Sequence, residues 1–279
     1  MMLSRAMREV FRREALPARA RWWMAAAGML DWYAFLGSRL RPHLGERARD
    51  VVARAAKRTM ERRVEATPGA RPDPGLFAAA LYRLYAAPRA GWVLSAMGGR
   101  PKTTRAWWEA SRTVASLDAE ARWREVTVHL GELLVVLTDD LPAELPHARK
   151  ILGDICKEAG ARYAKRMKRL WNLPDEPEDP VALSIEILRT SEYLFRVNPE
   201  HWSAADETAR TGFLEGTACP WYERPGWNGA HCGIFGQFQA GVTGELGLKY
   251  LLAKTIPKHG GGTCRVDLKP LDPSSLVRR

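Results

Sequence analysis

The sequence predicts an α+β protein, in which an N-terminal helical region is followed by a C-terminal domain with a small antiparallel sheet packed by helices. Through the first two-thirds of the 279 residues, apolar side chains recur every three or four positions between prolines. That spacing is typical of helices that bury one face. After residue 200, glycine becomes frequent and apolar residues alternate with polar ones, which is typical of turns and strands.

The N-terminal region is expected to span residues 1–147 and to be helical throughout. Its apolar periodicity and its prolines predict helices over 2–15, 18–36, 45–65, 75–87, 103–126 and 130–138. A linker is expected at 67–75, because the sequence TPGARPDPG contains three prolines and two glycines in nine residues.

The C-terminal domain is expected to span residues 148–270, with a tail at 271–279. Its clearest helix covers 148–171, and the proline-rich acidic segment NLPDEPEDP then ends that helix and caps the next, over 181–195. Strands are predicted over 207–217, 248–256 and 263–268. Gly260, Gly261 and Gly262 form the turn between the last two, because glycine accepts positive φ.

The net charge of +11 lies mainly in the first 65 residues, which hold 15 basic and 7 acidic side chains. The remaining 214 residues hold 28 basic and 25 acidic side chains. A cationic amphipathic helix at 2–15 can bind an anionic surface, although packing on its own domain is the commoner outcome. Since the charge lies outside the C-terminal domain, we expect no nucleic-acid partner.

The sequence predicts a soluble, cytoplasmic protein with no transmembrane segment. The most apolar early stretch, 22–37, has 16 residues and contains Asp31, so it is too short and too charged to span a bilayer. No apolar segment with a cleavage site follows the basic N-terminus, and four cysteines are too few for a secreted disulfide scaffold. The sequence is compatible with a homo-oligomer.

Three of the four cysteines, Cys219, Cys232 and Cys264, lie in the glycine-rich last quarter, whereas Cys156 has the spacing of a buried core residue. Cys232 lies at the glycine-flanked start of a helix, where free N–H groups would lower the pKa of its thiol. The three cysteines could supply a catalytic thiol, bind zinc with an open fourth position, or be buried structural thiols. Spacings of 13 and 32 residues match no short zinc-binding pattern, so we expect no cofactor and do not favour zinc.

Several polar side chains could act as a base for Cys232. His231 is its neighbour, but adjacent helical residues point about 100° apart, which argues against a direct hydrogen bond. His201, Glu215 and His259 are the other candidates, brought near by the fold. Aromatic residues of the same region would either wall a small apolar pocket or belong to the core; they are Trp221, Tyr222, Trp227 and Phe235.

The order of these features matches a known pattern. A long helix, an acidic break and a second helix precede Cys219 and Pro220; the helix-opening Cys232 follows, and a hairpin from Lys254 through the glycine turn to Cys264 closes the domain. On these features, residues 148–268 resemble the L-2-amino-thiazoline-4-carboxylic acid hydrolase family. The hairpin also looks like the 4-vinyl reductase domain, a small-molecule-binding and sometimes zinc-binding relative, but Lys254 and Pro257 replace the extra acid and cysteine ligands of that domain.

The resemblance implies hydrolytic opening of a cyclic amidine-like C–N or C–S group, with a thiazoline precursor of cysteine as the family's substrate. If the family's active-site cysteines correspond to those of this chain, Cys219, Cys232 and Cys264 would line the active site, and Cys232 would be the nucleophile. Such a reaction also needs a proton donor for the leaving atom and a cation for a substrate carboxylate. Two residues are candidates for each role: His231 or His201 for the proton, and Lys254 or Arg265 for the carboxylate.

One departure from the family pattern concerns the segment after the second cysteine. The family often carries an aspartate soon after it, whereas here no carboxylate follows Cys232 until Glu245. This difference favours two alternatives to the family's reaction: a related reaction, or a non-catalytic, sensor-like module that binds a small molecule. A third hypothesis is an anionic-surface binder that acts through the basic helices of residues 1–65.

Overall fold

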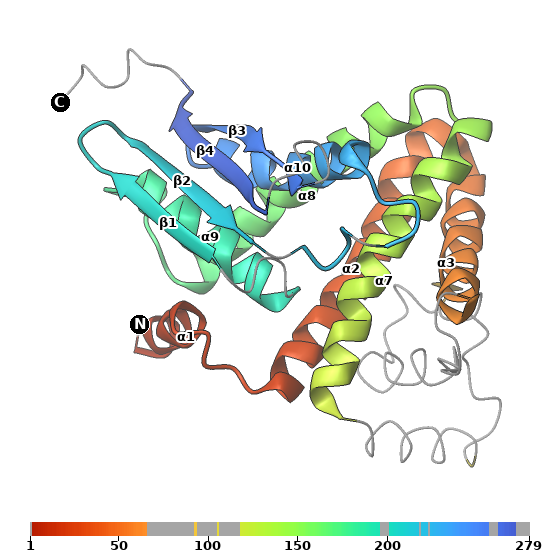
Figure 1. The fold of residues 1–279 in the computed structure, drawn as a ribbon, viewed down its shortest axis with the longest axis horizontal. Coiled ribbons are helices and arrows are strands. Elements are labelled where there is room, and N and C mark those ends of the chain that lie inside the picture. The colour runs from red at the N-terminus through yellow and green to blue at the C-terminus, as the bar shows by residue number, and fades with distance from the viewer. Residues whose placement is uncertain are drawn as a thin grey trace. The chain divides into compact units, whose positions relative to one another are not determined.

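The chain folds into two compact units in the computed structural model, and the α+β class is confirmed (Figure 1). One unit comprises residues 17–148, and the other combines 1–16 with 149–279. The structure describes residues 2–65, 92–93, 105, 118–195, 201–217, 219–222, 224–256 and 262–271. The predicted linker at 67–75, the predicted helix at 75–87 and most of the predicted helix at 103–126 lie outside these residues.

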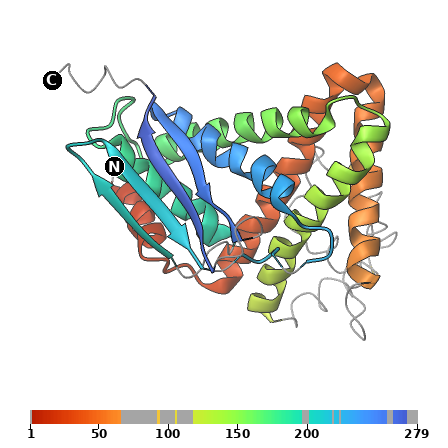
Figure 2. The ribbon, with the colours of Figure 1, turned by 45° about the horizontal axis from the view of Figure 1, so that its top comes forward.

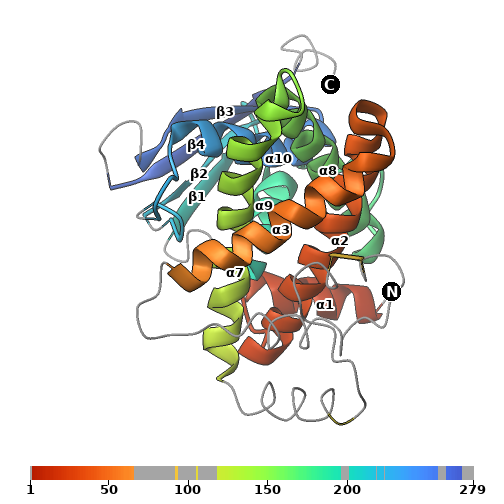
Figure 3. The same ribbon diagram turned by 90° about the vertical axis from the view of Figure 1, so that its right-hand side faces the viewer.

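The unit of residues 17–148 is helical in its described part. Its elements are α2 (Ala18–Leu44), η1 (Gly45–Arg47), α3 (Ala48–Glu65), α7 (Ala119–Asp140) and η2 (Leu141–Ala143). Helix α2 packs against both α3 and α7 (Figure 3), with Met29, Tyr33 and Leu133 fully buried. The predicted break between 126 and 130 is wrong, because α7 continues through it with Val126 and Leu133 in one core.

Ion pairs balance much of the basic charge of α2, η1 and α3. Arginines of these elements form ion pairs with acidic side chains that come later in the same unit. Arg62 Nε, for example, lies 3.2 Å from the carboxylate of Glu132. The other pairs are Arg21–Glu120, Arg47–Glu144, Arg54–Glu144 and Arg58–Asp140. The charge asymmetry of the sequence is therefore partly offset by folding, since partners far apart in the chain meet.

The other unit is built of α1 (Met2–Arg12), α8 (Ala148–Leu170, from its second residue), α9 (Pro180–Leu194), α10 (Gly229–Gly244) and a four-stranded antiparallel sheet. The sheet order is β1-β2-β4-β3 (Figure 2). Its strands are β1 (His201–Asp206), β2 (Thr211–Gly216), β3 (Leu248–Lys254) and β4 (Cys264–Pro270). The predicted strand at 207–217 starts only at Thr211, because residues 207–210 form the turn that pairs β2 with β1. The sequence analysis did not predict β1.

One face of the sheet packs against helices, with Leu214, Val266 and Leu268 in the core. Behind that face, α8 and α10 approach closely at two glycines. A Cβ on Gly160 would lie 1.8 Å from the backbone oxygen of Phe238, and one on Gly241 would lie 1.9 Å from that of Lys157. Since real side chains never approach backbone so closely, these glycines fix how near α10 lies to α8.

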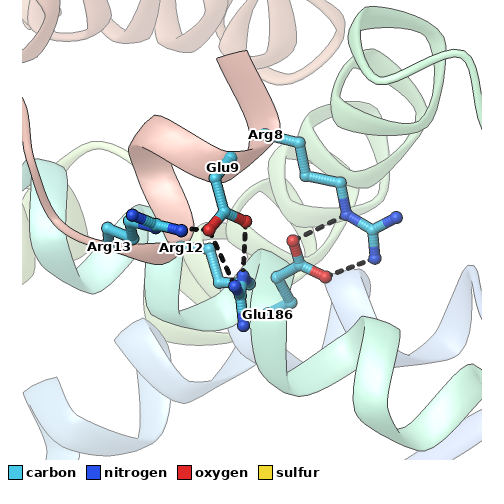
Figure 4. A network of polar contacts seen from close by, with 5 residues as sticks. All are labelled: Arg8, Glu9, Arg12, Arg13 and Glu186. Carbon is cyan, nitrogen blue, oxygen red and sulfur yellow. Dashed lines mark hydrogen bonds and ion pairs between the residues drawn. The ribbon is translucent and has the colours of Figure 1, made fainter. Parts of the chain in front are cut away.

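Helix α1 packs on α9 through a network of polar contacts (Figure 4). Arg8 donates from Nε and Nη2 to the two carboxylate oxygens of Glu186, at 2.7 and 2.5 Å. Hydrogen bonds from Arg12 and Arg13 lower the pKa of Glu9 to about 2. The first sixteen residues, which the sequence placed with 1–147, thus belong to the unit that holds the sheet. Three of their arginines, Arg8, Arg12 and Arg13, form ion pairs within it.

No helix in the described part of the chain is both long and apolar enough to cross a membrane.

Candidate functional site

A cavity of about 60 Å³ lies within the sheet-containing unit. Its walls come from α9, α10, the covered face of the sheet and the segment between β2 and α10. The lining residues are Glu192, Leu214, Cys219, Trp221, Trp227, Cys232, Phe235, Gln239, Tyr250, Leu252, Thr255, Cys264 and Val266. Most of this surface is apolar or aromatic, so a ligand entering the cavity leaves most of its water behind.

The fold brings the three cysteines of the last quarter to this one cavity. Cys219 follows β2, Cys232 lies in the first turn of α10, and Cys264 is the first residue of β4. All are free thiols, and the Sγ of Cys264 accepts a hydrogen bond from the backbone N–H of Ile256 at 3.3 Å. Cys156, by contrast, is a buried core residue outside the cavity, as its spacing predicted.

The expected lowering of the pKa of Cys232 is wrong in direction. Burial raises the pKa of this thiol, because the apolar lining solvates a thiolate poorly; the Trp227 side chain and the backbone N–H of Cys232 itself oppose the shift without reversing it. Burial also raises the pKa of Cys264, and that of Cys219 to about 11. At neutral pH the cavity therefore presents mainly neutral thiols.

Three of the four predicted aromatic residues line the cavity. The Trp221 ring lies 4.9 Å from that of Trp227 and 5.0 Å, edge to face, from that of Phe235. Tyr222 is 43% exposed and does not line the cavity. The aromatic wall thus comes from two segments, residues 221–227 and helix α10.

His231 caps a helix. Its Nδ1 accepts the backbone N–H of Asn228 at 3.1 Å, while the Asn228 side chain accepts that of Ala230 at 2.9 Å. These bonds form a capping box at the start of α10. The His231 ring also stacks on Trp227, with centroids 5.2 Å apart. The residue is buried but is absent from the cavity lining.

The remaining predicted site residues do not line the cavity. Arg265 lies on the opposite face of the sheet, where Nε donates to Asp267 at 2.8 Å, Nη1 lies 3.4 Å from Glu215 and the guanidinium stacks on a phenylalanine at 4.1 Å. His201 and Lys254 lie at strand ends outside the lining. His259 lies outside the residues that the structure describes.

The cavity also holds a polar chain that the sequence did not predict. Tyr250 donates through its hydroxyl to Oε1 of Gln239 at 2.5 Å, and Nε2 of Gln239 donates to Oε1 of Glu192 at 3.3 Å. Two spacing signals could have found it. Gln239 follows Cys232 by seven residues on α10, and Glu192 follows the buried Leu188 by four on α9, so each shares a helix face with a cavity or core residue.

Within the described residues, no three side chains of histidine, cysteine, aspartate or glutamate are grouped so that they could hold a metal ion. The three cysteines line one cavity, but they do not form such a group.

No protein-family model matches this chain, and comparison with curated proteins and with solved structures likewise yields no match. The case for a function therefore rests on the residues of the cavity.

Proposed function

We propose that the protein is a small-molecule hydrolase that opens a C–N or C–S bond of a cyclic amidine-like or thiazoline-like substrate by cysteine chemistry, in amino-acid or specialised metabolism. The observation that carries this proposal is the convergence of Cys219, Cys232 and Cys264, which are 13 and 32 residues apart, on one aromatic-walled cavity. Cysteines gathered by chance into a core would not be expected to share a cavity with a buried carboxylate and amide.

The reaction begins with the Sγ of Cys232 forming a bond to the amidine carbon of the substrate. The electron pair of the C=N bond moves to nitrogen, which takes up a proton. The tetrahedral carbon then expels its ring sulfur or nitrogen, which leaves with a proton, and water displaces the enzyme's thiol to complete the hydrolysis. The complete cycle adds one water molecule to the substrate and returns Cys232 as a free thiol, so no oxidant or reductant is needed.

The surroundings of the thiols differ, and the difference indicates which thiol acts as the nucleophile and which as the proton donor. Cys232 is the best nucleophile, because it lies in the first turn of α10, where its own backbone N–H favours the thiolate. Cys219, whose pKa is about 11, stays protonated at neutral pH and can give a proton to the leaving atom. A positively charged amidinium in the cavity would itself favour the thiolate of Cys232 on binding.

The test is turnover of a panel of thiazolines and cyclic amidines by the wild-type protein and by single cysteine variants. We expect Cys232→Ala to lower kcat/KM by about a hundredfold or more, the loss usual for removal of a catalytic nucleophile, with an unchanged melting temperature. Cys156→Ala is the matched control, because this thiol is buried outside the cavity. Full activity in Cys219→Ala, Cys232→Ala and Cys264→Ala alike would exclude the proposed chemistry.

A second candidate function is a sensor-like module that binds a small molecule without turning it over. The raised pKa values of the three cavity thiols favour it, since few thiolates are present at neutral pH. Saturable binding of a panel compound with no product after prolonged incubation would support this function and exclude the hydrolase.

A further inference from the structure

We infer that strand β1 is a dimerisation edge, and that its partner is the β1 strand of a second copy of this chain. The two strands pair antiparallel about a two-fold axis at Ala204, which joins two four-stranded sheets into one continuous sheet. The inference does not depend on the proposed function, because β1 contributes no residue to the lining of the cavity.

Strand β1 forms an exposed edge of the sheet. The strand order β1-β2-β4-β3 makes β1 and β3 the two edges (Figure 1). In the described part of the chain, β1 pairs with β2 alone, and five of its six residues are exposed. The outer side of an edge strand presents a row of backbone N–H and C=O groups, which can pair with another extended chain.

The two edges of the sheet differ in their protection against such pairing. Strand β3 carries Lys249 and Lys254, and its pairing with β4 is interrupted by a bulge between Leu252 and Lys254. Lysines and bulges on an edge strand hinder pairing with another chain. The β1 sequence HWSAAD has no lysine, arginine or proline, and its register with β2 is continuous over all six residues. The sheet therefore obstructs pairing at β3 and permits it at β1.

Small side chains at the centre of β1 favour self-pairing. Directly opposite residues of an antiparallel pair lie on the same face of the sheet, so a two-fold axis normal to the sheet must pass through a residue position. An axis at Ala204 places this residue opposite the partner's Ala204, and Ser203 opposite the partner's Ala205. These side chains let two backbones approach to the roughly 4.8 Å of paired strands without a clash.

The ends of the paired strands are complementary in the same register. It places Trp202, which is 44% exposed, opposite the partner's Asp206. An indole N–H is a donor and a carboxylate an acceptor; Asp206 accepts the backbone N–H of Ala209 through Oδ1 and has a second oxygen for the indole. The two Asp206 side chains lie four positions apart along the strands, about 13 Å, which exceeds the screening length of about 10 Å at 0.1 M salt.

The first test is the oligomeric state of the full-length wild-type protein. Sedimentation velocity over about a hundredfold range of concentration should show a reversible monomer–dimer equilibrium, because a dimer forms by mass action. A monomer at every concentration would overturn the inference, and so would a monomer that binds only extended peptides of foreign sequence.

Charges placed on the two-fold axis locate the interface. Ala204→Lys and Ala204→Glu each put two like charges opposite one another, so each should raise the dissociation constant of the dimer by about tenfold or more. An equimolar mixture of the two variants should restore the dimer, because lysine then lies opposite glutamate. Ala253→Lys is the matched control, since it places the same charge on an exposed alanine of β3 and should dimerise as wild type does. A dimer that survives both Ala204 variants, or a mixture that stays monomeric, would overturn the inference.

Hydrogen exchange of the wild-type protein provides a test that needs no variant to fold. Backbone amides of residues 201–206 should become better protected as the protein concentration rises, because the partner strand then accepts their hydrogen bonds. Amides of residues 248–254 should exchange at a rate independent of concentration. A dimer in which β1 gains no protection would place the interface elsewhere and overturn the inference.

Discussion

The two faces of strand β4 carry opposite chemistry, although their residues alternate in the chain. On the covered face, Cys264 and Val266 line the cavity. On the other face, Arg265 and Asp267 form an ion pair that Glu215 of the neighbouring strand extends. Successive strand residues point to opposite sides of the sheet. The buried thiol of Cys264 and the ion-paired guanidinium of Arg265 therefore lie on opposite faces, although the two residues are neighbours in the chain.

This difference shows where reactivity can arise in the unit. On the Arg265 face, the charges of Arg265, Asp267 and Glu215 are already paired with one another, so they have little to offer a ligand. On the cavity face, burial changes the properties of the groups instead: it raises the pKa of each of the three thiols, and Glu192 accepts a hydrogen bond from Gln239. A candidate site is therefore better identified by buried polar groups around a cavity than by charged residues in the sequence.

The largest expected change is a loss of stability when the packing of the helices that cover the cavity face is disturbed. Gly160→Ala would drive a Cβ into the backbone of α10 near Phe238. We expect a loss of about 3 kcal/mol in the free energy of unfolding, the upper range for overpacking a core, measured by urea denaturation. Gly233→Ala on α10 is the control, because nothing lies within 4 Å of its Cβ. A neutral Gly160→Ala would mean that α8 and α10 lie further apart than the structure shows.

A second test concerns the protonation of the cavity thiols. Burial raises the pKa of Cys232 and Cys264 above that of an ordinary thiol, and that of Cys219 to about 11. Iodoacetamide labelling should therefore quicken about tenfold per pH unit and keep rising beyond about pH 9. Mass spectrometry of quenched samples gives the rate at each cysteine, with glutathione as the unburied control. A plateau below pH 8 would contradict the desolvation of this face.

The same shifts predict a loss of stability at alkaline pH. The folded state holds the proton of each thiol more tightly than the unfolded chain does, so it binds more protons between the two pKa values. The stabilisation is complete below the unfolded pKa and is lost as the pH rises toward the folded one, which for Cys219 is about 11. Urea titrations from pH 8 to 11 should show a falling midpoint, and replacing Cys219 with alanine should reduce the fall.

The smallest effect is expected on the opposite face. Arg265→Gln removes an ion pair whose arginine side chain is 38% exposed, and such pairs contribute about 0–1 kcal/mol. Turnover should stay within about twofold of wild type, because this side chain does not reach the cavity. A large loss of kcat/KM for a carboxylate substrate would show instead that Arg265 acts in binding, as the sequence-based prediction holds.

Much of the fold could be predicted because its signals are local. The helix at 148–171 and the one at 181–195 differ by only a residue from α8 and α9, since apolar spacing and the Asp179 cap define them. Strand β1 was missed, because its residues are nearly all exposed and show no alternation. The aromatic and cysteine residues of the cavity were recognised by type, whereas Glu192 was not, because a single carboxylate on an apolar helix face resembles ordinary surface charge in sequence.

The sequence by itself determined α8, α9, the two strands of the closing hairpin and the identity of the three thiols, because apolar periodicity, helix capping and strand alternation act between near neighbours. Only the tertiary structure decided what those thiols share. It brought Glu192, Gln239 and Tyr250 from three separate elements to one cavity and reversed the expected shift in the pKa of Cys232. The physical reason is desolvation: whether a group is charged, paired or reactive depends on water that distant segments exclude.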